Sequence, residues 1–275
     1  MATKEHKEHK GLSAEREPQP VSLSAFSTTR ERPPTICSDV QPLAFSLQPS
    51  AFLLLRQGKN AADYNMAMDE ALLQAAPQWG RPVLRFYGWL EPAATFGYSQ
   101  SYAEIEKLTV LRPLVRRPTG GGLVPHDADW TYSLVFPAGH FWHRFKAVES
   151  YRRVHEWIRD AFAQMGVATN LAAASQKEIP GQCFVGAEKD DVLWHGRKIA
   201  GAAQRRTRSG LLIQGSVQPP PIGLKREQWE NAMCDVARTA FSVEWQNMPS
   251  DGELERLAAE LQLRKYGQSS YNRKR

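Results

Sequence analysis

A cysteine and a lysine in the second half of the sequence are the residue types that acyl transfer through a thioester requires. Cys183 lies in a predicted loop, and Lys198 follows a predicted turn at His195-Gly196. An ammonium near a thiol favours the thiolate, which attacks thioesters and takes over their acyl group. An uncharged lysine would instead take a proton from an incoming amine. Spacing alone leaves the alternative open, because a lone cysteine is usually a small buried hydrophobe.

The other two cysteines, Cys37 and Cys234, have no comparable neighbours and are interpreted as structural or incidental. Three cysteines without framework spacing indicate free thiols in a reducing compartment, so we expect a cytoplasmic protein. No combination of cysteine and histidine has the spacing of a metal site. No apolar run is long enough to predict a membrane-spanning helix.

A glycine-rich loop is the second candidate for chemistry. Three glycines at 120–122 stand between two predicted strands and leave the backbone open to a ligand, whose carbonyl or phosphate oxygen free N–H groups could hold. An ordinary hairpin turn is an equal alternative, and a P-loop is not indicated because no Gly-Lys-Ser/Thr follows. The polar residues that flank the glycines are Arg116, Arg117, Thr119, His126 and Asp127. On its own, His126 is more often structural than catalytic.

The elements that position these residues are predicted strands, several of them in runs, and amphipathic helices. Strands are predicted over 52–55, 83–89, 95–98, 114–117, 130–136, 191–194, 199–204 and 211–217. Helices are predicted over 63–74 with Asp63 as the cap, and over 102–108, 147–165, 225–238 and 251–265. Runs of strands with segregated helices predict an α+β fold with mixed or antiparallel sheets.

The first 49 residues differ from the rest of the 275-residue chain, because Lys-Glu-His repeats and then Ser, Thr and Pro dominate. We expect a disordered tail over 1–49 and one catalytic domain over 50–275. The formal charge of +6 fits an acidic partner but is also common without one. A basic patch at Arg205, Arg206 and Arg208 is either a docking site or a solvated strand face, and no pattern indicates nucleic-acid binding.

Several motifs in order resemble the lipoate-protein ligase and octanoyltransferase family, whose catalytic domain has a biotin/lipoate ligase-like fold. The glycine loop with His126-Asp127 is similar to the signature loop of that family. The other segments that carry the resemblance are 65–72, 196–204, 214–216 and 266–272. The resemblance covers about residues 51 to 275.

Within the family, Cys183-Phe184 ahead of Lys198 resembles the LipM-type octanoyltransferase branch. The resemblance implies that Cys183 takes octanoate from octanoyl-acyl carrier protein as a thioester, with Lys198 stabilising the thiolate. The acceptor would be a lysine of a lipoyl-domain protein such as glycine cleavage H protein or an E2 subunit. Neither a cofactor nor a metal is then expected. Implied substrate-binding residues are Arg116, Arg117, Thr119, Gly120, Gly121, Gly122, His126, Tyr98, Gly201 and Ala202, and Phe86, Tyr87 and Tyr98 are candidate walls of an acyl tunnel.

Two alternatives remain open at this point. One is an ATP-dependent lipoate-protein ligase, which would need ATP and magnesium. The other is an acyl- or lipoyl-binding module without activity.

Overall fold

The computed structural model describes residues 50–176, 184 and 186–274, so the expected tail and Cys183 lie outside the described residues. The strands are β1 (Ser50–Asn60), β2 (Val83–Trp89), β3 (Ala93–Phe96), β4 (Leu114–Arg116), β5 (Val124–His126), β6 (Trp130–Pro137), β7 (Asn170–Leu171), β8 (Val192–Trp194), β9 (Arg197–Arg206), β10 (Gly210–Val217) and β11 (Val243–Asn247). The helices are α1 (Ala62–Trp79), α2 (Tyr102–Ile105), α3 (Phe141–Arg144), α4 (Ala147–Gln164), α5 (Arg226–Phe241), α6 (Gly252–Leu261), the π-helical turn η1 (Gln262–Tyr266) and α7 (Ser269–Asn272).

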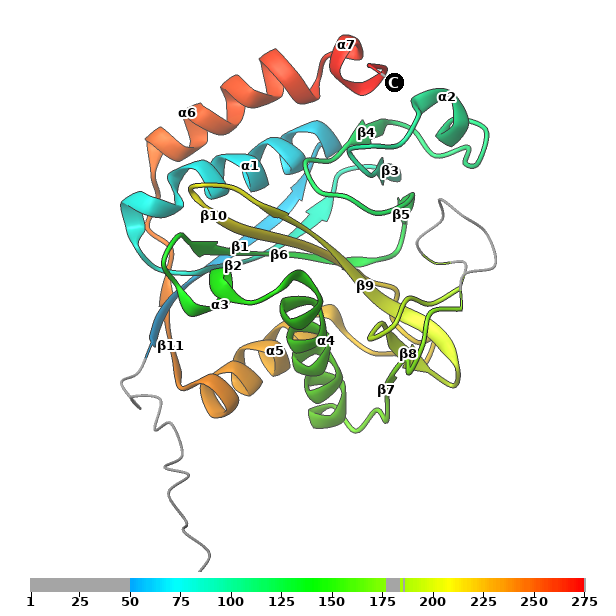
Figure 1. Cartoon of the computed structure of the whole chain (residues 1–275), viewed down its shortest axis with the longest axis vertical. Helices are drawn as coiled ribbons and strands as arrows, with labels where there is room; N and C mark the ends of the chain where they lie inside the picture. The colour runs from blue at the N-terminus through cyan, green and yellow to red at the C-terminus, as the bar shows by residue number, and fades with distance from the viewer. Residues whose placement is uncertain (1–49, 177–183, 185, 275) are drawn as a thin grey trace, which may run out of the picture. The chain divides into compact units, whose positions relative to one another are not determined.

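The main sheet of the described residues has the strand order β11-β1-β2-β6-β10-β9-β8-β7. β1 pairs in parallel with β11 and β2, whereas the pairs from β2 to β7 are antiparallel. Figure 1 shows α1 and α6 on one face of this sheet and α4 and α5 on the other. The α+β prediction with a mixed sheet is confirmed.

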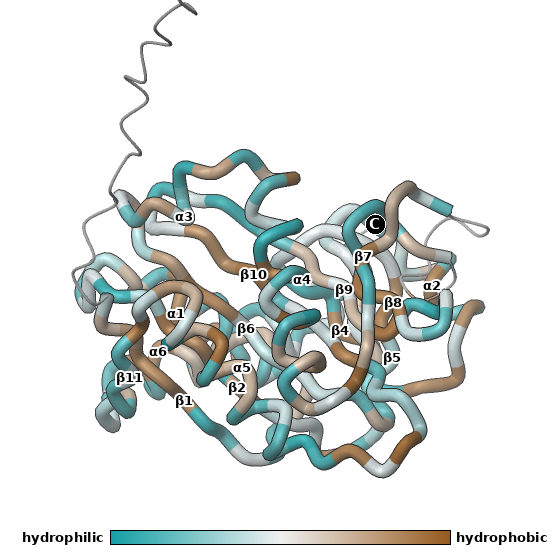
Figure 2. The backbone as a smooth tube through the Cα atoms, turned by 90° about the horizontal axis from the view of Figure 1, so that it is seen from below, coloured by the Kyte–Doolittle hydropathy of each residue, from teal (hydrophilic) through white to brown (hydrophobic). Residues whose placement is uncertain are grey.

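Alternation along the central strands builds a core on each face. Leu84 and Phe86 pack with residues of α4 and α5, whereas Val83 packs with residues of α1 and α6. Successive side chains of a strand point to opposite faces, so one strand serves both cores. Figure 2 shows the hydrophobic run along β1, which supplies Phe52 to one core and Leu53 to the other.

A second sheet of three strands has the order β4-β3-β5. β3 runs parallel to β4 and antiparallel to β5, so the glycine loop between β4 and β5 crosses from one edge of β3 to the other. The hairpin alternative is therefore wrong. The crossing is tight at Gly97, where an added Cβ would lie 1.9 Å from the carbonyl oxygen of Gly121. Glycine is needed there because any side chain would displace the loop.

Among the local predictions, the turn at His195-Gly196 is confirmed, whereas the helix cap at Asp63 is wrong. The turn at His195-Gly196 joins β8 and β9, and both residues have positive φ (48° and 78°), as a two-residue hairpin turn requires. Asp63 does not cap α1: the N-cap is Ala61, and the Asp63 carboxylate accepts from the N–H of Tyr64 within the first turn. The short strands β5 and β11 were not predicted.

Candidate active site

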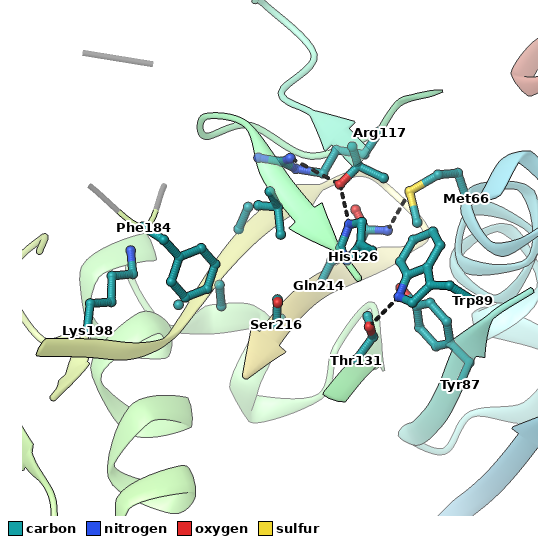
Figure 3. Close-up of a pocket in the computed structure, with 16 residues that line it drawn as sticks. Met66, Tyr87, Trp89, Arg117, His126, Thr131, Phe184, Lys198, Gln214 and Ser216 are labelled. Atoms are coloured by element: carbon teal, nitrogen blue, oxygen red, sulfur yellow. Dashed lines mark hydrogen bonds between the residues drawn. The ribbon is translucent and has the colours of Figure 1, made fainter. Parts of the chain in front are cut away.

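An apolar cavity opens between the main sheet, α1 and the three-stranded sheet (Figure 3). Its walls come from α1, from β2, β6, β9 and β10 of the main sheet, and from β3 and β5. The lining residues are Met66, Tyr87, Trp89, Thr95, Arg117, Val124, His126, Thr131, Phe184, Lys198, Gly201, Ala202, Ala203, Gln214, Gly215 and Ser216.

Lys198 and Phe184 lie together at one end of this cavity (Figure 3). Lys198 is 9% exposed, and its Nζ lies 5.2 Å from the centroid of the Phe184 ring. The same Nζ lies 2.7 Å from Oδ2 of the fully buried Asp191. Lys198 is thus held at the cavity as one half of an ion pair, which makes its burial tolerable.

Trp89 and His126 close the other end. Their rings stack with centroids 3.8 Å apart. His126 Nδ1 lies 2.8 Å from Oδ2 of Asp129, and its Nε2 lies 2.8 Å from Oγ1 of Thr95. The Asp129 oxygen also accepts from the hydroxyls of Thr131 and Ser216. Both ring nitrogens of His126 therefore have protein partners, and the geometry gives His126 a structural role in this wall.

The glycine loop is held from inside by Arg117. The guanidinium donates to the carbonyl oxygen of Gly120 at 2.6 and 3.0 Å and to that of Gly122 at 2.7 Å. The Thr119 hydroxyl donates to Oε1 of Gln214 on β10 at 2.7 Å. These contacts fix the loop over the cavity. The cavity lining includes Arg117, whereas Thr119, Gly120, Gly121 and Gly122 are outside the lining.

Arg116 points to the C-terminal segment and not into the cavity. Its guanidinium is buried and donates to backbone carbonyl oxygens of Tyr98, Gln100, Tyr271 and Asn272. Five donors in a planar fork suit such a cluster of carbonyls. Arg116 therefore ties the C-terminal segment to β4, and it is not among the residues that line the cavity. Tyr98 also lies outside the lining, where the ammonium of Lys274 sits 3.8 Å from its ring centroid.

A buried polar cluster around Asp69 supports the cavity from the α1 side. The Asp69 carboxylate accepts from Arg85 at 2.6 Å, Tyr87 at 3.0 Å, Ser133 at 2.7 Å and Gln214 at 2.7 Å. Burial raises the pKa of Tyr87 well above its usual value, so the phenol stays protonated and donates its hydrogen bond. The cluster joins α1, β2, β6 and β10.

The structure brings together part of what the sequence suggested. Lys198, Arg117, His126, Gly201 and Ala202 line the cavity, as does the candidate wall Tyr87. The wall prediction for Phe86 is wrong, because Phe86 points to the opposite face of β2 and packs on Trp229 at 5.5 Å between ring centroids.

Residues that sequence reasoning missed include Asp191, Asp129 and Asp69. The signal for Asp191 depends on strand pairing: Asp190 and Asp191 stand directly before β8, the hairpin partner of the strand that carries Lys198.

Cys234 is buried on α5, as expected for a structural cysteine. Burial raises the pKa of its thiol to about 11, so it remains a thiol at neutral pH. In the described residues, no cluster of three or more His, Cys, Asp or Glu side chains offers a metal site. Across the same part of the chain, none of the helices combines the length and apolarity needed to cross a membrane.

The fold is that of lipoate-protein ligases. A crystal structure of lipoate-protein ligase A bound with ATP superposes with a TM-score of 0.67 at 21% identity, covering 82% of this chain and 99% of that one. A putative lipoate protein ligase from T. acidophilum with bound lipoic acid superposes with a TM-score of 0.68 at 20% identity, covering 83% and 100%.

The sequence family follows from a more direct match. The family model of the lipoyl protein ligase A/B catalytic domain matches residues 61–218, which is more than half of the 275-residue chain. The chain therefore belongs to this family, and the predicted resemblance is confirmed.

Curated relatives include octanoyltransferases. The octanoyltransferase LipM of Macrococcus caseolyticus is 32% identical over 179 residues, which is 60% of this chain and 65% of that protein. LipM of Carboxydothermus hydrogenoformans is 36% identical over 161 residues, which is 56% and 59%. The matched segment thus spans less than two thirds of the length of these relatives.

Proposed function

We propose that the chain transfers an octanoyl group to a lysine of a lipoyl domain through a thioester on Cys183. One observation carries the proposal: in a member of this family, Lys198 and Phe184 lie together at one end of an apolar cavity, and Phe184 follows Cys183 directly in the chain. The names of the curated relatives support octanoyl as the transferred group.

The first half-reaction forms the acyl-enzyme. The thiolate of Cys183 attacks the carbonyl carbon of an octanoyl thioester, for which we propose octanoyl-acyl carrier protein as donor. The bond between that carbon and the donor sulfur breaks, and the donor leaves as a thiol after taking one proton. The octanoyl chain lies along the apolar walls formed by Met66, Tyr87 and Ala202, with Lys198 at the carbonyl end. A positive charge there stabilises both the thiolate and the developing oxyanion.

The second half-reaction makes the amide. A neutral lysine amine of the acceptor attacks the thioester carbon, the carbon–sulfur bond of the acyl-enzyme breaks, and the departing thiolate of Cys183 takes the proton that the amine loses. The reaction requires neither ATP nor a metal in this scheme. The acceptors that we propose are lipoyl-domain proteins, such as glycine cleavage H protein and E2 subunits.

Intact-mass measurement tests the nucleophile. The protein is mixed with octanoyl-acyl carrier protein in the absence of ATP, and we expect a gain of one octanoyl group that a lipoyl domain then removes. Cys183→Ala abolishes the gain. Cys234→Ala is the matched control and retains it, because the pKa of that buried thiol is raised to about 11. Full transfer by Cys183→Ala would falsify the thioester mechanism.

The ligase alternative predicts the opposite cofactor requirement. A ligase modifies the lipoyl domain only when free lipoate or octanoate is supplied with ATP and magnesium, and it makes no adduct from the thioester donor. An inactive binding module gives neither product. The same acceptor domain, analysed by mass in both reactions, separates the three functions.

A further inference from the structure

Lys198 is held by a small group of residues from three separate segments: Asp191 before β8, Tyr151 on α4 and Gly201 on β9. We propose that Asp191 is a positioning residue that fixes the ammonium group of Lys198 for acyl transfer, an inference that rests on the proposed function. Tyr151 and Gly201 complete the arrangement, the first by orienting the carboxylate and the second by leaving space for the amine.

The Asp191 carboxylate is held on both oxygens. Oδ2 accepts from Lys198 Nζ at 2.7 Å and from the backbone N–H of Glu188 at 2.6 Å, and Oδ1 accepts from the Tyr151 hydroxyl. Asp191 is 0% exposed. A buried carboxylate with three donors keeps one orientation, because rotating it would break charge-assisted bonds in a region of low polarity.

Gly201 supplies the room that the amine occupies. A Cβ at this position would lie 2.8 Å from Cε and 2.9 Å from Nζ of Lys198, and 3.3 Å from Oδ1 of Asp191. Real Cβ atoms do not approach this closely, so any larger residue at 201 would push the lysine tip away. Lys198 would otherwise be free to sample many rotamers along its four-carbon chain.

The ion pair also determines what Lys198 can do. An ammonium has three N–H donors, and the contact to Asp191 uses one of them while the side chain lines the cavity. The remaining donors of Lys198 can therefore face a carbonyl oxygen in the cavity while the ion pair fixes the position of Nζ.

Two variants test this by different physical means. Asp191→Asn keeps the shape and removes the charge, whereas Gly201→Ala keeps the charge and displaces the amine. For each we expect kcat for octanoyl transfer to fall on the order of 10–100-fold with KM for the donor within about twofold, because misplacement by about 1 Å has costs of this size.

Asp190→Asn is the matched control. It makes the same chemical change one residue away, at a buried position with φ of 70°, which asparagine tolerates. We expect its kcat to match that of the wild type. Urea unfolding of all variants identifies any that act through stability alone. Asp191→Glu keeps the charge but has a longer reach, so it should recover only part of the lost kcat.

The outcomes separate this inference from the proposed function. If the wild type forms no octanoyl adduct, the function itself is wrong. If the wild type transfers octanoate and folded Asp191→Asn does so with unchanged kcat, the positioning role is wrong. Unchanged kcat in Gly201→Ala overturns the role of the space at 201.

Discussion

Asp69–Arg85 and Asp191–Lys198 are both buried ion pairs of nearly equal length, 2.6 and 2.7 Å, yet their cations have different surroundings. Arg85 also donates to Gln57 at 2.7 Å and to the backbone and side chain of Asn65 at 3.1 and 2.8 Å, and it lies 3.9 Å from the Tyr87 ring centroid. Lys198 has Asp191 and the Phe184 ring, and it lines a cavity.

The same type of buried ion pair can therefore serve two different purposes. A guanidinium that donates its hydrogen bonds to protein atoms, as Arg85 does, holds elements of the fold together and is not available to a ligand. An ammonium with one carboxylate partner at the edge of a cavity is fixed in place and can still respond to a new negative charge. The Asp69–Arg85 pair therefore belongs to the architecture, and under the proposed function the Asp191–Lys198 pair belongs to the chemistry.

Breaking the structural pair should have the largest effect. Arg85→Met leaves the Asp69 carboxylate buried without its cation, and we expect the free energy of unfolding in urea to fall by about 3–5 kcal/mol. The control is Arg56→Met, whose pair with Glu230 is 3.3 Å long and has an arginine side chain that is 45% exposed. Glu230 is buried but keeps a second ion pair with Arg226 at 2.7 Å, so loss of the partly exposed Arg56 should cost about 0–1 kcal/mol. Equal losses in the two variants would contradict the comparison.

Removing the Lys198 ammonium should lower the rate of octanoyl transfer more than it lowers the free energy of unfolding. Lys198→Met should lower kcat for octanoyl transfer by about 10²–10³-fold, as the loss of one transition-state donor does. The free energy of unfolding should fall by only about 1–3 kcal/mol, the usual penalty for an unsatisfied buried group. Tyr151 and the Glu188 N–H still satisfy Asp191, and water from the cavity can take the place of Nζ. A stability loss as large as that of Arg85→Met would show that Lys198 too is architectural.

A pH dependence should distinguish the two regions, because His155 adjoins the second pair and not the first. Burial lowers the pKa of His155 to about 4 in the folded protein, whereas in the unfolded chain it is about 6.5. Between these values the unfolded chain binds the extra proton, so stability is complete above about pH 6.5 and falls by up to about 3 kcal/mol as the pH drops to 4.

The measurement is the free energy of unfolding across that pH range. His155→Leu should flatten the curve but not abolish its slope, because burial also lowers the pKa of His140 to about 4. If the free energy of unfolding of His155→Leu changed with pH in parallel with that of the wild type, the lowered pKa of His155 in the folded protein would be contradicted.

Local patterns predicted much of this fold, and the failures have physical reasons. The aromatic and β-branched residues of β2 and β6 and the His195-Gly196 turn before β9 are short-range signals, so they were visible. Which face of β2 meets the cavity depends on how the sheet packs, and for that reason Phe86 was placed wrongly. β5 contains Pro125 and only three residues, too few to show a period.

The site was predictable from the sequence only at residues whose type indicates a particular chemistry. Lys198 was singled out as a partner for Cys183 and because residues 196–204 resemble the lysine motif of the family. The partner Asp191 is recognisable only once β8 and β9 are paired, because an aspartate before a strand is otherwise an ordinary turn residue. The Asp69 cluster requires α1 to lie across β2, β6 and β10, a long-range arrangement that no local pattern contains.

The smallest effect is expected from breaking the hydrogen bonds that connect the Asp69 cluster to the glycine loop. Gln214 donates to Asp69 at 2.7 Å and accepts from the Thr119 hydroxyl at 2.7 Å, so it connects the structural pair to the loop over the cavity. Thr119→Val removes that hydroxyl and leaves a buried amide oxygen without its donor. We expect the free energy of unfolding to fall by about 1–2 kcal/mol.

Thr239→Val on α5 is the control for this last change. Its hydroxyl donates to helix carbonyl oxygens at an exposed position, and surface substitutions of this kind stay within about 0.5 kcal/mol. KM for the octanoyl donor should rise a few-fold in Thr119→Val and remain unchanged in Thr239→Val, because only the first loosens the loop. A stability loss in Thr119→Val without any change in KM would mean that the Asp69 cluster supports the fold but does not affect substrate binding in the cavity. Gln214 would then be the last residue of a purely structural network.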